Sequence, residues 1–195
     1  MTYASSVGDE LAGLLAIGER AAFLDAPADG IAALQRAAAL AQESGDAAAR
    51  GRAGWLLGVC RTAMGRYGLA AADLSVLCGD GALAGSLRSL AASAIAAVHR
   101  QLGDATSARD WDAAALDIAG DSPEAQVEAV AGLAADAVAL GEAGAARDAI
   151  DRAQVLLDAA PQWWRQAIRL DIVRGDLALL EHDPVRALTA AERAV

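Results

Sequence analysis

Few residues in this chain have side chains suited to covalent or metal chemistry, and they stand far apart in the sequence. The only histidines are His99 and His182, and the two cysteines are Cys60 and Cys78. The cysteines form no Cys-x-x-Cys pair, and a metal site needs three or four converging ligands. A nucleophile needs a base close to it, and neither histidine has a serine or cysteine in such a setting. The sequence therefore predicts no enzyme, no cofactor and no metal, with both cysteines serving as small buried apolar residues.

A phosphate-binding loop is also excluded. The glycine-rich stretch "GDGALAG" (79–85) follows a predicted helix and contains no lysine. The lysine of such a loop is the residue that reaches the phosphates. Lysine and asparagine are absent from the whole chain, so every basic side chain is arginine.

Charge and hydropathy exclude two further classes of partner. The formal net charge is −10 and the isoelectric point is about 4.5, which argues against nucleic acid and against an anionic membrane surface. No apolar run is long enough for a transmembrane span. The first residues, "MTYASSVGDELAG", lack the basic region and apolar core of a signal peptide, so we expect a cytoplasmic protein.

A seven-residue phrase recurs along the chain. "LGDATSA" begins at residue 102, "LGEAGAA" at 140 and "MGRYGLA" at 64, and more degenerate copies are "LDAPADG" at 24 and "EHDPVRA" at 181. The copies are 38 to 41 residues apart. A nearly fixed period of this length is the signature of a repeat protein.

Two columns of small residues stand at fixed distances from the second position of this phrase. Seven residues before it are Gly18, Gly58, Ala96, Ala134 and Gly175, and five residues after it are Gly30, Ala70, Ala108, Ala146 and Ala187. Glycine is about 1 kcal/mol less favourable than alanine inside a helix, so its recurrence in one column needs a packing reason. We expect a helical hairpin whose two helices touch where no side chain fits.

The segments between these positions have the pattern of helices. "DELAGLLAIGERAAFL" and "EAQVEAVAGLAADAVAL" carry apolar residues at spacings of three and four, without the alternation of a strand. The prolines fall at the seams: Pro27 and Pro184 in hairpin turns, Pro123 and Pro161 between hairpins. The run 121–124, "DSPE", is a helix start with a capping residue, a proline and an early carboxylate.

We therefore predict an all-α protein of about ten helices in five antiparallel pairs, forming one domain over residues 1–195. An alanine-rich composition with 4% aromatic residues fits closely approaching helices. The predicted units are residues 8–45, 46–80, 82–120, 122–160 and 162–195.

The repeat resembles that of the tetratricopeptide (TPR) superfamily over nearly the whole chain. "WLLGVCRTAMGRYGLAAADL" (55–74) matches the family motif at Leu57, Gly58, Gly65 and Ala70, with Trp55 one place late. Residues 93–114 match through Gly103 and Ala108, and residues 131–153 through Gly141 and Ala146. Most aromatic positions of the motif are missing, and the units exceed the usual length of about 34 residues.

Long units of this kind resemble the sensor arrays of maltose-regulator-type bacterial transcription activators and related signalling ATPases. The resemblance implies a TPR-like right-handed α-solenoid with a concave binding face.

In that superfamily the first helix of each pair lines the concave groove. Carried across by register, the groove positions are Leu15, Glu19, Arg52, Trp55, Val59, Arg100, Gln101, Glu128, Arg169, Ile172 and Asp176. Arg52, Arg100 and Arg169 would bind carboxylates of a peptide bidentately, and Trp55 would be the apolar anchor. The alternative is that Arg52 and Arg169 only pair with acidic residues of adjacent helices. A clamp for C-terminal carboxylates, as in chaperone-binding members, is excluded because it uses lysine and asparagine.

The remaining tryptophans have structural explanations as well as functional ones. Trp163 and Trp164 are adjacent, and neighbouring residues of a helix point about 100° apart. We expect one to pack on the preceding hairpin and favour packing for both, while an exposed one would be an interaction candidate. Trp111 is expected in the core between repeats. His99 is placed at the groove or its edge.

The sequence thus predicts a non-catalytic scaffold or sensor module that binds a protein or peptide along its concave face. The alternative is an assembly module that forms a homodimer or docks a fused domain through its last helix, "RALTAAERAV". That segment has no capping helix after it, so the chain is expected either to be a piece of a longer protein or to dock there.

Overall fold

The computed structural model describes residues 3–159 and 162–194, and these residues form ten helices and no strand. The helices are α1 (Tyr3–Phe23), α2 (Pro27–Ser44), α3 (Ala47–Ala63), α4 (Tyr67–Gly79), α5 (Gly85–Gln101), α6 (Ala105–Ile118), α7 (Pro123–Ala139), α8 (Ala143–Asp158), α9 (Trp164–Leu180) and α10 (Pro184–Arg193). Pro27, Pro123 and Pro184 occupy the first turns of α2, α7 and α10. The predicted place of Pro161 lies outside the described residues.

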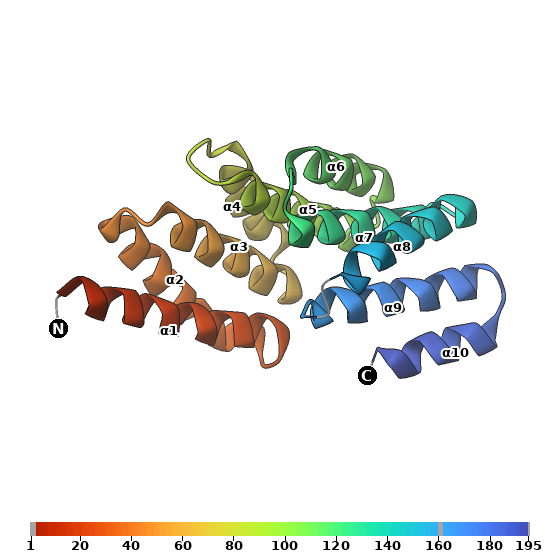
Figure 1. Ribbon diagram of the computed structural model, residues 1–195, viewed down its shortest axis with the longest axis horizontal. Helices are drawn as coiled ribbons and strands as arrows, with labels where there is room; N and C mark the ends of the chain where they lie inside the picture. The colour runs from red at the N-terminus through yellow and green to blue at the C-terminus, as the bar shows by residue number, and fades with distance from the viewer. Residues whose placement is uncertain (1–2, 160–161, 195) are drawn as a thin grey trace.

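The ten helices form five consecutive antiparallel hairpins in two layers (Figure 1). Each helix contacts its neighbours in the sequence, and each odd-numbered helix also contacts the next odd-numbered one. Among the described residues the even-numbered helices contact only odd-numbered ones, so the odd helices form an inner layer and the even helices an outer layer. The hairpins follow an arch, in which α1 and α9 return to the same side of the molecule. The prediction of an all-α helical repeat fold is confirmed.

The recurring phrase encodes the hairpin turn. Its second position takes left-handed φ angles of 72°, 80° and 76° at Gly65, Gly103 and Gly141. In the third hairpin the Asp104 N–H then donates to the carbonyl of His99 at 2.9 Å, which ends α5. The Asp104 carboxylate accepts from the Ser107 N–H at 3.0 Å, which begins α6. His182 holds the same turn position in the last hairpin with φ 60°, a strained conformation for a residue with a Cβ.

The two columns of small residues are the contact line within each hairpin. A Cβ on Gly58 would lie only 2.5 Å from Cδ2 of Leu74 on the facing helix. The buried members of the columns are Gly18, Gly30, Gly58, Ala70, Ala96, Ala108, Ala134 and Ala146. Gly175 and Ala187 of the last hairpin are half-buried. The expected close approach of the two helices is therefore present.

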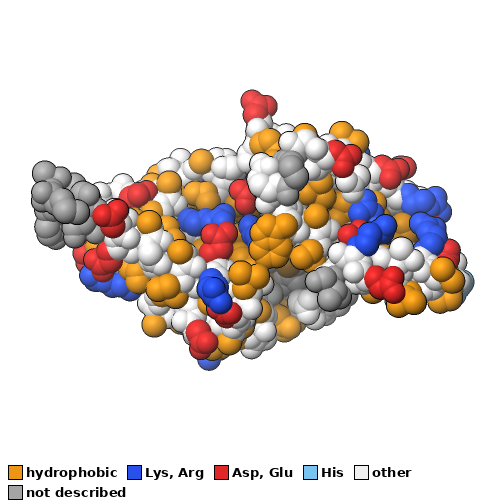
Figure 2. Space-filling model, turned by 60° about the horizontal axis from the view of Figure 1, so that its bottom comes forward, with side chains coloured by type: hydrophobic (Ala, Val, Ile, Leu, Met, Phe, Trp, Pro, Cys, Tyr) orange, Lys and Arg blue, Asp and Glu red, His pale blue; other side chains and the backbone are white. Residues whose placement is uncertain are grey.

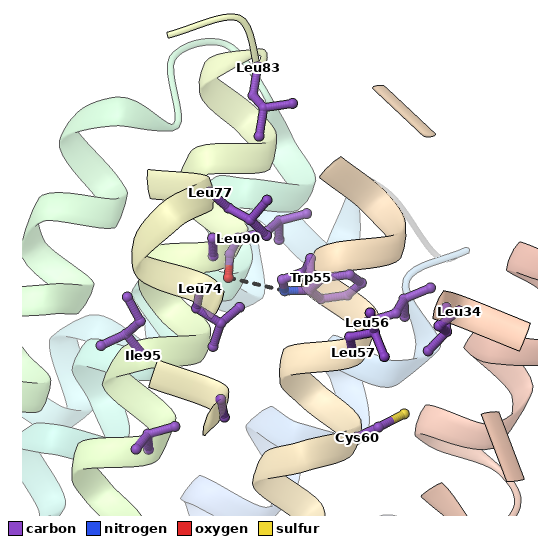
Figure 3. Packing of buried hydrophobic residues seen from close by; sticks show 13 residues of the cluster. Leu34, Trp55, Leu56, Leu57, Cys60, Leu74, Leu77, Leu83, Leu90 and Ile95 are labelled. Atoms are coloured by element: carbon purple, nitrogen blue, oxygen red, sulfur yellow. Dashed lines mark hydrogen bonds between the residues drawn. The ribbon is translucent and has the colours of Figure 1, made fainter. Parts of the chain in front are cut away.

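The two largest apolar clusters of the core are joined by alanines. The first spans α2 to α5 and includes Leu34, Leu74 and Ile95, several of which are drawn in Figure 3. The second lies among α7, α8 and α9. Between them, α5, α6 and α7 pack through buried alanines, with Trp111 against this junction as predicted. No helix in the described part of the chain has the combined length and apolar character that crossing a membrane requires.

Candidate functional site

The inner layer carries a cavity of about 390 Å³ to which all five odd-numbered helices contribute. Its apolar lining comes from α1, α3, α4 and α5, and includes the rings of Phe23, Trp55 and Tyr67 beside Ala94 and Ala97. Its charged lining comes from α7 and α9. The volume and the mixture of aromatic and polar groups are typical of a binding site for a small group or one side chain.

Trp55 forms part of the cavity wall and is not an exposed anchor. Its side chain is buried, with only 4% of the residue surface exposed. Its indole N–H donates to the carbonyl of Leu90 on α5 at 3.1 Å, as Figure 3 shows. The ring centroid lies 5.9 Å from that of Phe23. Trp55 thus offers the cavity an apolar ring surface, while its polar end joins α3 to α5.

Two of the arginines expected to bind ligand carboxylates already have carboxylate partners. Arg52 Nη2 donates to Glu19 Oε1 of α1 at 2.9 Å, and its guanidinium lies 4.5 Å from the Trp55 ring centroid. Arg169 of α9 pairs with Glu128 of α7. These are the pairs between adjacent helices that the alternative interpretation predicted.

Arg165, which sequence reasoning missed, connects the two ends of the arch. From the first turn of α9, its guanidinium lies 4.0 Å from the centroid of Phe23 on α1. Its Nη2 is 3.9 Å from Glu19 Oε1 and 3.6 Å from Glu124 Oε1 on α7. No sequence pattern indicates this contact, because it depends on the curvature that all five hairpins accumulate.

Arg100 does not face the groove as a free guanidinium. Its Nη1 donates to Asp112 Oδ2 at 2.6 Å and to Asp136 Oδ1 at 2.7 Å. Both carboxylates have no exposed side-chain surface, and 14% of the Arg100 side chain is exposed. The expected role of Arg100 in binding a peptide carboxylate is therefore wrong. Arg100 instead joins α5, α6 and α7 at the junction between the two apolar clusters.

Burial changes the protonation of this cluster. It raises the pKa of Asp112 to about 7, against the opposing effect of Arg100. Burial likewise raises the pKa of Asp136. Within the described chain, Asp112 Oδ1 and Asp136 Oδ2 have no hydrogen-bond partner. Gly132 makes room for the cluster, since a Cβ there would lie 2.1 Å from Asp112 Oδ2.

The other predicted groove residues lie in three kinds of place. Val59, Gln101 and Glu128 line the cavity together with Trp55 and Arg169. Ile172 and Asp176 are exposed on α9 and lie outside the cavity lining. Leu15 packs against the first apolar cluster.

The two adjacent tryptophans differ in burial. Trp163 packs against the second apolar cluster, while Trp164 is 46% exposed. Packing of one is therefore confirmed, and the favoured packing of both is wrong. His99 lies with Nδ1 3.4 Å from Asp104 Oδ2, at the end of α5.

The cysteines lack the surroundings of reactive thiols. Burial raises the pKa of Cys60 and raises that of Cys78 to about 11, so both remain protonated near neutral pH. Within residues 3–159 and 162–194, no group of three or more histidine, cysteine or acidic side chains is arranged to hold a metal ion.

Comparison with known proteins adds no assignment. No protein-family model matches the chain, and no curated protein is significantly similar to it.

Proposed function

We propose that this chain is a non-catalytic, cytoplasmic binding module of the TPR type, whose inner-layer cavity receives an apolar side chain from a segment of another protein. The observation that carries the proposal is the cavity of about 390 Å³ lined by Phe23, Trp55 and Tyr67. Aromatic side chains in such a pocket contribute large contact areas, and peptide recognition depends on a few buried anchors of this kind.

The ion pairs around the cavity favour an uncharged occupant. Arg52, Arg165 and Arg169 each lie within 4.0 Å of a glutamate, so a ligand carboxylate would have to displace an existing partner. The polar groups that remain are neutral. Ser93 lines the cavity and is 2% exposed, and its hydroxyl has no hydrogen-bond partner among the described residues. A neutral polar atom of the ligand, next to its apolar side chain, would give the Ser93 hydroxyl a hydrogen-bond partner.

Panning a displayed library of random peptides against the purified chain tests the proposal, with Ala97→Leu as a counter-target. Ala97 is half-buried and lines the cavity, so a leucine there extends into the space that the anchor would occupy. We expect enriched peptides to share an aromatic or branched apolar residue. Their affinity should fall about tenfold or more for Ala97→Leu, the loss of one buried anchor.

Ala113→Leu is the matched control, because Ala113 is an exposed residue of the outer helix α6. Its peptide affinity should equal that of the wild type. Enrichment of acidic peptides that bind Ala97→Leu as well as the wild type would contradict the proposal. The assembly alternative rests on exposed apolar residues of α10, Val185 and Leu188. A dimer that Leu188→Glu dissociates, in a chain that enriches no peptide, would favour that alternative.

A further inference from the structure

A second cavity lies among the last three helices. Its volume is about 370 Å³, and it is lined by residues of α8, α9 and α10. Four of the lining residues are arginines: Arg147, Arg174, Arg186 and Arg193. Figure 2 shows arginine side chains gathered at the right-hand end of the molecule, which carries the last hairpin.

Two carboxylates pair with these four guanidinium groups, and each carboxylate pairs with two of them. Arg147 Nε donates to Glu181 Oε1 at 2.8 Å, and Arg186 Nη1 donates to Glu181 Oε2 at 3.0 Å. In the same way, Arg174 Nη1 lies 2.8 Å and Arg193 Nε 3.5 Å from Asp171 Oδ1. Arg147 and Arg193 each contact their carboxylate through Nε. The two terminal nitrogens of each guanidinium group are therefore not used in these contacts.

The carboxylates lie behind the arginines. The side chains of Glu181 and Asp171 are 19% and 14% exposed, whereas those of Arg147 and Arg186 are 57% and 61% exposed. Neither carboxylate belongs to the cavity lining, in which Asp151 is the acidic residue. The four arginines therefore outnumber the three carboxylates, and the cavity has a local excess of positive charge in a chain whose net charge is −10.

We propose that this cavity binds a small phosphate-bearing anion. Its arginines come from three helices, and several guanidinium groups around one cavity suit the tetrahedral oxygens of phosphate better than a single planar carboxylate. The cavity volume falls in the range of small-molecule sites. The site is independent of the inner-layer cavity, since the two share no lining residue.

Isothermal titration with pyrophosphate and inorganic phosphate, at constant ionic strength in sodium chloride, tests the site. The informative variant is Arg186→Gln/Arg193→Gln, because Glu181 keeps Arg147 and Asp171 keeps Arg174 as partners. We expect the wild type to bind one pyrophosphate per chain, and the variant to bind it about tenfold more weakly or worse. Inorganic phosphate should bind in the same place with lower affinity.

Arg36→Gln/Arg109→Gln is the matched control. It removes the same charge from two arginines outside the cavity, which pair with Glu10 and Glu142. This control should bind pyrophosphate like the wild type. Equal binding by both double variants would overturn the site, and so would tighter binding of succinate, a dicarboxylate, than of pyrophosphate.

Discussion

Asp112 and Asp136 place two carboxyl groups beside one guanidinium in a part of the fold that solvent does not reach. One arginine can neutralise one carboxylate, so the second is stabilised when it is protonated. Arg100 makes one short hydrogen bond to each aspartate, and the more distant Arg169 also acts on both. The cluster therefore couples proton binding to the packing of α5, α6 and α7.

Asp112→Asn should change how stability depends on pH. The folded-state pKa of Asp112, about 7, exceeds its ordinary value of 3.8. The stability that its protonation contributes is fully present below about pH 4 and is lost as the pH rises through 7. Relative to Asp112→Asn, the wild type should thus lose a few kcal/mol in the free energy of unfolding between pH 4 and pH 8. Urea unfolding across that range measures the difference, and a difference independent of pH would refute the assignment.

At the scale of the element, the hairpin is defined by small residues where its two helices cross. Ala108 has no exposed surface, and it stands five residues after Gly103, the left-handed turn residue. In the same helix, Ala113 is exposed. These two alanines allow one substitution to be compared at a packed and an unpacked position.

Ala108→Leu should destabilise the chain by about 1–3 kcal/mol, because the added atoms must displace the facing helix. Ala113→Leu should change stability by less than about 0.5 kcal/mol, as is usual at exposed sites. Thermal unfolding followed by circular dichroism measures both. Equal melting temperatures for the two variants would show that the repeat register is misplaced.

At the scale of the whole molecule, side chains alone connect the first and last hairpins. Arg165 reaches Phe23 and Glu19 across the arch, while the backbones of α1 and α9 are not in contact in the described residues. The ion pairs are long, and such pairs contribute about 0–1 kcal/mol each. The first and last hairpins are therefore held to each other across the arch by a few weak interactions.

Arg165→Met should widen the arch and leave the melting temperature nearly unchanged. Spin labels can be attached to cysteines introduced at the exposed positions Ile17 and Ile172, in a Cys78→Ser background. Pulsed electron paramagnetic resonance then reports the distance between α1 and α9. We expect a longer and broader distance distribution in Arg165→Met. Arg109→Met, which removes an ion pair to Glu142, should leave the distribution as it is. An unchanged distribution in both would mean that helix packing alone sets the width.

By itself, the sequence determined the number of helices, their pairing and the contact line within each hairpin. These features are local: a left-handed glycine such as Gly103, a capping aspartate such as Asp104 and small residues at fixed spacings act within one unit. The membership of Val59 and Gln101 in the inner layer follows from the same register.

Only the tertiary structure decided which inner-layer side chains remain accessible to a ligand. Arg100 is occupied by carboxylates 12 and 36 residues further along the chain, on two other helices. Arg165 meets Glu19 because small rotations between successive hairpins add up around the arch. Whether a guanidinium is free depends on these long-range distances, and a repeat pattern constrains only the spacing between neighbouring units.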